Sequence, residues 1–102
     1  MAHDYLEKRD FVRIKLDCDI DLKMHQGKRQ FTARARDLSA KGVLFHTSEI
    51  LECGDQLDLH LESGQALLSV LDADIEVVRV VLLGAGEYAV GSLIHSIAGS
   101  AQ

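Results

Sequence analysis

The chain has 102 residues, of which 47% are hydrophobic, 26% are charged and 5% are aromatic, and its formal net charge is -5. This length and apolar fraction fit one compact domain with a core large enough to fold, and they exclude a disordered acidic chain. The acidic total argues against a general nucleic-acid binder, because affinity for a polyanion needs many cationic contacts.

The charges are distributed unevenly along the chain. Residues 1–41 hold ten Lys and Arg against seven acids, a balance of +3, whereas residues 42–102 hold only Arg79 against nine acids, a balance of -8. A few arginines in the basic part could therefore hold a small anionic ligand although the whole chain is acidic.

Signals for export, membrane insertion and metal binding are missing from the sequence. Its longest apolar stretch, residues 77–85, is interrupted by Arg79 and is too short to span a bilayer. Residues 1–13 are too polar for a secretory signal. Cys18 and Cys53 are too few for a disulfide framework, and the five histidines lie too far apart for a metal-ligand motif. We expect a cytoplasmic protein without a metal or another cofactor.

Strict alternation of apolar and polar residues over 14–24 predicts the first strand. A turn at 25–28 containing Gly27 leads to a second alternating segment at 31–36, which predicts a hairpin. The outer face of the first strand is acidic and that of the second is basic. We expect Asp17, Asp19 or Asp21 to pair with Arg34 or Arg36 across the hairpin.

A third strand is expected at 42–46, after a turn at 37–42, and a fourth at 57–61, before a turn at Ser63 and Gly64.

Residues 67–83 are too long for one ordinary strand, and a bend or turn is expected at 72–74. Beyond it, alternation puts Arg79 on the same face as Ile75 and Val77. The last strand, 88–94, follows a turn at 84–86. Six or seven short strands in one hundred residues predict an all-β fold, an antiparallel barrel that is closed or nearly closed.

Two short segments carry candidate binding residues. Arg9 and Arg13 lie four positions apart just before the first strand, and the turn at 37–42 reads Asp37-x-Ser39-x-x-Gly42. Taken singly, each has an ordinary interpretation: solvated surface charge for the arginine pair, and structural turn residues for the second segment.

Together and in this order, the two segments resemble the PilZ domain family, whose members bind the bacterial second messenger cyclic di-GMP. Arg9 and Arg13 match the family's Arg-x-x-x-Arg pattern, and Asp37, Ser39 and Gly42 match its (Asp/Asn)-x-Ser-x-x-Gly turn. Residues 75–80 and 86–91 resemble its last two barrel strands.

The resemblance implies a single PilZ-like domain over residues 1–102. A flexible N-terminal segment, 1–13, would clamp the ligand against a barrel, 14–95. The tail, 96–102, departs from relatives that end in a helix, because it is long enough for a short helix at most. The implied ligand contacts are Arg9, Arg13, Asp37, Ser39 and Gly42, with Lys8 and Arg36 as second-rank candidates.

These residue types suit the ligand chemically. A guanidinium can meet the O6 and N7 acceptors of guanine together, or clamp a phosphate in bidentate fashion. Asp37 can accept hydrogen bonds from the N1 and N2 donors of guanine, and Ser39 can donate to or accept from the base or a phosphate. Gly42 allows a backbone conformation or a close approach that a Cβ would block.

An enzyme is disfavoured, since the sequence lacks a nucleophile and base at a recognisable spacing and a glycine loop for phosphate. The favoured function is a cyclic di-GMP receptor that relays the signal to a downstream protein. The first alternative is a PilZ-like adaptor that works through protein contacts without a ligand. The second alternative is an oligonucleotide-binding barrel, which the sparse aromatic residues oppose.

Overall fold

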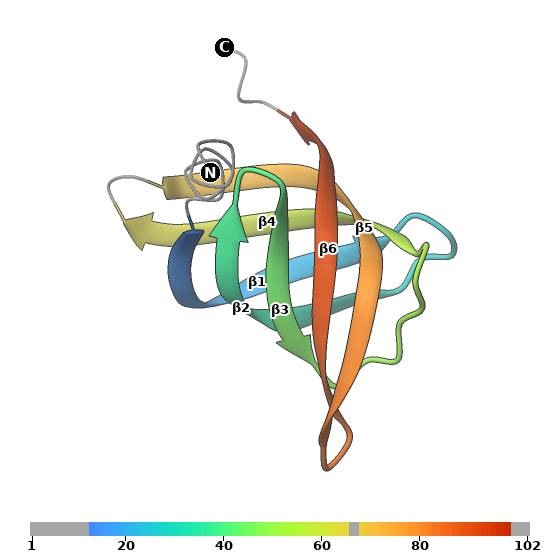
Figure 1. Cartoon of the computed structure of the whole chain (residues 1–102). Helices are drawn as coiled ribbons and strands as arrows, with labels where there is room; N and C mark the ends of the chain where they lie inside the picture. Colours follow the sequence, from blue (N-terminus) through green and yellow to red (C-terminus); the bar gives the residue numbers. More distant parts are fainter. Residues whose placement is uncertain (1–12, 66–67, 99–102) are drawn as a thin grey trace, which may run out of the picture.

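The chain folds into a closed antiparallel β-barrel, seen in a computed structural model that describes residues 13–65 and 68–98 (Figure 1). Neighbouring strands pair in the order β1-β2-β3-β6-β5-β4, and β4 returns to β1 to close the ring. The all-β barrel prediction is confirmed. The strands of the described residues are β1 (Arg13–Met24), β2 (Gln30–Ser39), β3 (Gly42–Thr47), β4 (Gln56–Gln65), β5 (Leu68–Gly84) and β6 (Glu87–Ala98).

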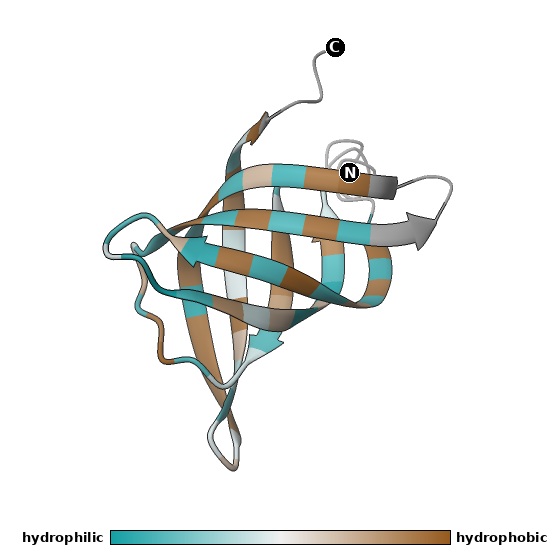
Figure 2. Cartoon of the chain, turned by 180° about the vertical axis from the view of Figure 1, so that it is seen from behind, coloured by the Kyte–Doolittle hydropathy of each residue, from teal (hydrophilic) through white to brown (hydrophobic). Residues whose placement is uncertain are grey.

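Alternation along the strands builds the core. Figure 2 shows it as hydrophilic and hydrophobic bands that succeed one another along the strands. Because successive side chains of a strand point to opposite faces, every second residue of β1 and, from Leu57 to Leu61, of β4 turns inward. Ile14 is an exception, since it is 40% exposed. The largest fully buried side chains are Phe45, Ile20, Leu22, Leu57, Leu59, Leu61, Ile75, Val43, Val77 and Val90.

The charges on the outside of the first hairpin pair as predicted. Arg34 Nε donates to Asp17 Oδ1 at 2.8 Å, and Arg34 Nη1 donates to Asp19 Oδ1 at 3.0 Å. The hydrogen bond from Arg34 lowers the pKa of Asp17. Arg36 makes no ion pair with any residue that the structure describes, so Arg34 is the arginine that joins the two strands.

Two predicted turns are wrong in extent. β2 continues through Asp37 and ends at Ser39, so the turn expected at 37–42 shrinks to residues 40 and 41. β4 continues through Ser63 and Gly64 to Gln65, because an irregularity after Glu62 absorbs these residues in the pairing with β5. The β4–β5 connection, 66–67, lies outside the described residues.

The segment expected to bend or turn at 72–74 is one unbroken strand, β5, of 17 residues. Its pairing with β6 shifts between Asp74 and Ile75 and again between Val77 and Arg79. The second shift puts Arg79 on the outer surface, not on the inner face with Ile75 and Val77. The long strand reaches past the barrel wall into the β5–β6 hairpin.

Both ends of the chain extend beyond the described part. β6 runs to Ala98, three residues past the expected barrel boundary at 95, and it takes up the first residues of the predicted tail. The predicted N-terminal clamp up to residue 12 and the last residues of the predicted tail, 99–102, lie outside the described residues. None of the described residues belongs to a helix long and apolar enough to cross a membrane.

Candidate functional site

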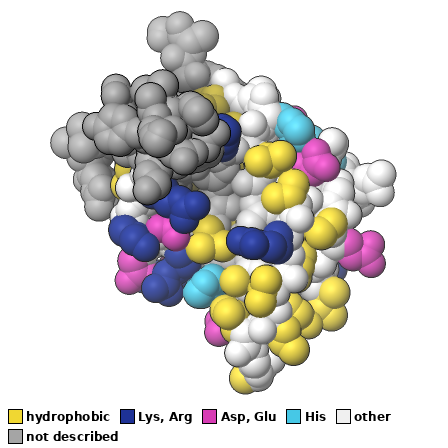
Figure 3. All heavy atoms as spheres, in the orientation of Figure 1, with side chains coloured by type: hydrophobic (Ala, Val, Ile, Leu, Met, Phe, Trp, Pro, Cys, Tyr) yellow, Lys and Arg dark blue, Asp and Glu magenta, His cyan; other side chains and the backbone are white. Residues whose placement is uncertain are grey.

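A groove of about 450 Å³ lies on the outside of the barrel, over β2, β3, β6 and β5. Figure 3 shows this face, where basic side chains lie next to hydrophobic ones. The groove contains the predicted turn motif together with one predicted and one unpredicted arginine. The residues that decide its chemistry are Arg13, Asp37, Ser39, Gly42, Arg79 and Leu93.

Strand pairing brings these residues together from distant parts of the sequence. Arg13, the first residue of β1, lies directly opposite Ser39, the last residue of β2. Gly42, the first residue of β3, lies opposite Leu93 on β6. The sheet itself therefore positions Arg13 beside the turn motif.

Two extra residues in the strands turn the polar side chains outward. The β2–β3 pairing advances two positions on β2, from Ala35 to Asp37, against one on β3. Ala35 is buried, but Arg36 and Asp37 both face outward. Arg79 follows a matching shift on β5. Such bulges change the direction of side chains, and here they supply the groove with one negatively charged side chain, Asp37, and one positively charged side chain, Arg79.

Asp37 is an acceptor whose hydrogen-bonding capacity is unused. Its side chain is only 15% exposed, and Oδ1 is buried without a hydrogen-bond partner among the described residues. Lys15 Nζ lies 3.4 Å from this oxygen, within ion-pair range but without hydrogen-bond geometry, on a side chain that is 87% exposed. An ion pair with such an exposed partner contributes little to stability. This carboxylate oxygen at the groove is therefore without a hydrogen-bond donor among the described residues.

Ser39 stabilises the tight turn between β2 and β3. Its Oγ accepts hydrogen bonds from the backbone N–H groups of Lys41 and Gly42, both at 3.3 Å. The structural interpretation of this residue is confirmed. The side chain is half-buried at the groove wall, so it can also meet a ligand from its outer side.

Gly42 is required by the close approach of β3 to β6. A Cβ built on it would lie 1.9 Å from the carbonyl oxygen of Ser92. Its backbone is not in the left-handed region, where the positive-φ glycines 27, 54, 84 and 86 lie. Of the two roles expected for Gly42, close approach applies, and the atom approached belongs to the protein.

Arg79 is the groove residue that sequence reasoning missed. It stands on β5 opposite Gly91, with Val78 and Leu93 beside it on the groove wall. These two side chains are 44% and 43% exposed and give the wall an apolar strip next to the arginine. A nucleobase could lie on this apolar strip while the guanidinium of Arg79 holds an anionic group.

The remaining predicted contacts are not part of the described groove. Arg9 and Lys8 lie outside the described residues. Arg36 is exposed next to Asp37 and is not among the residues that line the groove.

A larger hollow, of about 880 Å³, lies elsewhere on the barrel. Its lining includes four carboxylates, those of Asp21, Asp58, Asp72 and Asp74. This concentration of negative charge repels an anion, so the smaller groove is the better candidate for an anionic ligand.

Comparisons with known proteins agree with this architecture. A family model described as "PilZ domain" matches residues 7–94. The structure of the Bacillus subtilis inhibitor of motility (MotI/DgrA) has a TM-score of 0.70 and 15% identity, covering 89% of this chain and 44% of that one. The structure of K. pneumonia MrkH in its apo state has a TM-score of 0.60 and 16% identity, covering 81% and 41%. The chain thus spans less than half the length of either protein. No curated protein matches it.

Proposed function

The chain belongs to the PilZ domain family, and on this premise we propose that the groove over β2, β3, β5 and β6 binds cyclic di-GMP. The observation that supports this ligand best is the buried Oδ1 of Asp37, which has no hydrogen-bond donor among the described residues. A buried acceptor without a donor costs stability, and a ligand with N–H donors removes that cost.

Each groove residue has a role that fits the ligand. Asp37 accepts from N1 and N2 of one guanine, an edge that adenine does not offer. Arg13 and Arg79 hold phosphate oxygens or the O6 and N7 edge of guanine. Ser39 contacts the ligand from the turn, and Gly42 keeps β3 close enough to β6 for the groove to form. Arg9, with Lys8 beside it, is proposed to close over the ligand from the N-terminal side.

The proposed output is contact with a downstream protein in the cytoplasm, without any catalysed reaction. The apolar side chains Val78 and Leu93 lie in the groove wall, so a bound ligand changes the surface of which they form part. Val81, Leu82 and Leu83 are further exposed apolar residues on the part of β5 that leads into the β5–β6 hairpin. The same surface favours the alternative, an adaptor that binds its partner without cyclic di-GMP.

Titration calorimetry distinguishes the two proposals. The receptor releases or absorbs heat with cyclic di-GMP, and binds GMP much more weakly because GMP has one base and one phosphate. Arg13→Ala weakens binding by roughly ten- to a hundredfold, since it removes a charge-assisted contact, and Arg13→Lys restores little.

Arg34→Ala is the matched control, because Arg34 is also exposed on the hairpin but is paired with Asp17 and Asp19 outside the groove. It should bind like the parent. If the parent gives no heat with cyclic di-GMP at high micromolar concentration, the receptor proposal fails and the adaptor stands. If Arg13→Ala and Arg34→Ala bind equally well, the ligand lies elsewhere on the barrel.

A further inference from the structure

Three side chains with metal-ligand chemistry converge at the far end of β1 from Arg13. We propose that His25, Asp58 and Asp74 bind one divalent transition-metal ion, with Zn²⁺ as the best fit. The Nε2 atom and one oxygen of each carboxylate all lie within 4.8 Å of one another. The expectation from the sequence that the histidines lie too far apart for a metal-ligand motif considered spacing along the chain, whereas these three residues meet through the fold.

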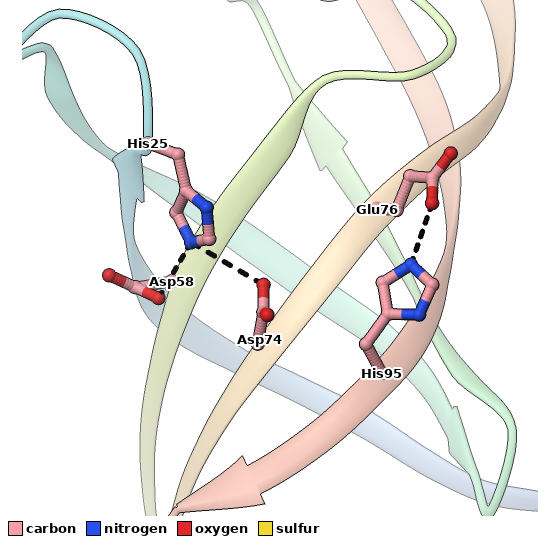
Figure 4. Close-up of polar contacts among 5 residues, drawn as sticks. All are labelled: His25, Asp58, Asp74, Glu76 and His95. Atoms are coloured by element: carbon pink, nitrogen blue, oxygen red, sulfur yellow. Dashed lines mark hydrogen bonds and ion pairs between the residues drawn. The ribbon is translucent and has the colours of Figure 1, made fainter.

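The barrel holds the three residues in fixed relative positions. His25 follows the last residue of β1, and its backbone N–H donates to the carbonyl oxygen of Gln56 at 2.9 Å. Asp58 on β4 lies directly opposite Asp74 on β5. Figure 4 shows the imidazole of His25 pointing between the two carboxylates. Three separate elements thus present their ligand atoms to one point.

The distances suit a small cation. His25 Nε2 lies 2.9 Å from Asp58 Oδ1 and 3.4 Å from Asp74 Oδ1. Zinc bonds to nitrogen and oxygen are roughly 2.0–2.2 Å long. Neighbouring ligands around one ion are then about 3.0 Å apart in octahedral and about 3.4 Å apart in tetrahedral geometry. The two distances from His25 Nε2 are close to these values, and the two carboxylate oxygens lie within 4.8 Å of each other.

A proton on His25 balances the negative charges of Asp58 and Asp74 only in part. Two like charges directly opposite each other on neighbouring strands destabilise the pairing. His25 donates its Nε2 proton to Asp58, while Oδ1 of Asp74 is buried and receives no hydrogen bond from the described residues. One N–H group satisfies one oxygen, whereas one metal ion can bind both oxygens and the imidazole at once.

The donor set selects the class of ion. One imidazole nitrogen and two carboxylate oxygens suit Zn²⁺ and similar borderline ions, whereas Mg²⁺ and Ca²⁺ prefer oxygen ligands alone. All three side chains are partly exposed, so water can complete the coordination. The bound ion would join the end of β1 to β4 and β5, the seam at which the barrel closes. Its role is structural and does not depend on cyclic di-GMP.

The test is a calorimetric titration of the full chain with ZnCl₂, after treatment with a chelator and removal of that chelator. We expect one ion per chain and a higher unfolding temperature with ZnCl₂ than without it. His25→Ala and Asp74→Asn should each weaken Zn²⁺ binding at least tenfold and abolish the rise in unfolding temperature.

His95→Ala is the matched control. His95 Nε2 lies 2.6 Å from Glu76 Oε1, a histidine–carboxylate pair that the described residues do not extend to a third metal-ligand group (Figure 4). This variant should bind Zn²⁺ like the parent. The proposal is overturned if the parent binds no Zn²⁺ at 100-fold molar excess, or if His25→Ala binds as tightly as His95→Ala. Circular dichroism of each variant without metal confirms that a loss of binding does not arise from unfolding.

Discussion

Replacing Gly42 with alanine separates a role in the fold from a role in ligand contact. The added Cβ would lie 1.9 Å from the carbonyl oxygen of Ser92, whereas real Cβ atoms stay at least 3.0 Å from such neighbours. One backbone must therefore move by at least 1.1 Å, the difference between these two distances. Ser92 is buried and both strands belong to a closed ring, so neither moves freely. Overpacking costs about 1–3 kcal/mol, and a clash with backbone puts Gly42→Ala near the upper end.

Urea unfolding of the ligand-free domain, followed by circular dichroism, measures this cost. Gly91→Ala is the control, because Gly91 lines the same groove but its Cβ would meet only the Arg79 Cβ, at 3.8 Å. It should unfold within about 0.5 kcal/mol of the parent. Equal stability of the two variants would refute the close approach of β3 to β6 and return Gly42 to the ligand.

Three further predictions concern Asp37, Arg79 and His60. Asp37→Ala should leave the ligand-free domain as stable as the parent in urea, or more so, and should remove cyclic di-GMP binding; a large loss of stability would make Asp37 a structural residue. Arg79→Ala should weaken cyclic di-GMP binding roughly ten- to a hundredfold in calorimetry, and unchanged affinity would exclude Arg79 from the site. Hydrogen bonds to Asp72, and to a lesser extent Glu62, raise the pKa of His60 above its usual 6.5. Their contribution to the free energy of unfolding is therefore complete below pH 6.5 and is lost as pH rises through the pKa of the folded state. The stability difference between parent and His60→Gln should therefore shrink from about pH 6 to about pH 9 in urea unfolding, and a constant difference would contradict the assignment.

Regular alternation could be predicted from sequence, but its interruptions could not. Residues 16–24 face as the period of two requires, and the hairpin charges pair accordingly. Arg79 was assigned to the wrong face because one additional residue after Val77 reverses the alternation, and no Gly, Pro or Asn near it marks that position. The length of residues 67–83 led to the prediction of a bend or turn at 72–74. Average strand lengths do not describe β5, because one strand forms both the barrel wall and a protruding hairpin.

The candidate site also has a part that could be predicted from sequence and a part that could not. Arg13, Asp37, Ser39 and Gly42 were predicted as a pattern, and the sheet places them in one groove. The roles of Ser39 and Gly42 within the turn depend on distances to the neighbouring backbone, which a sequence does not contain. The metal-ligand group joins residues 33 and 49 positions from His25 and exists only because β4 pairs with both β1 and β5. Arg9 and Lys8 remain predictions.

The two bulges beside the groove each place two consecutive side chains on the outer surface of the barrel. Arg36 and Asp37 on β2, and Val78 and Arg79 on β5, face outward together because each strand carries one residue more than the partner strand at that point. Deleting Arg36 or Val78 would restore regular pairing, and Asp37 or Arg79 would keep its outward face while the inward-facing residues on either side kept their places. The extra residue at each bulge can thus vary or be lost within one unchanged ring of strands that still presents Asp37 and Arg79 to the groove.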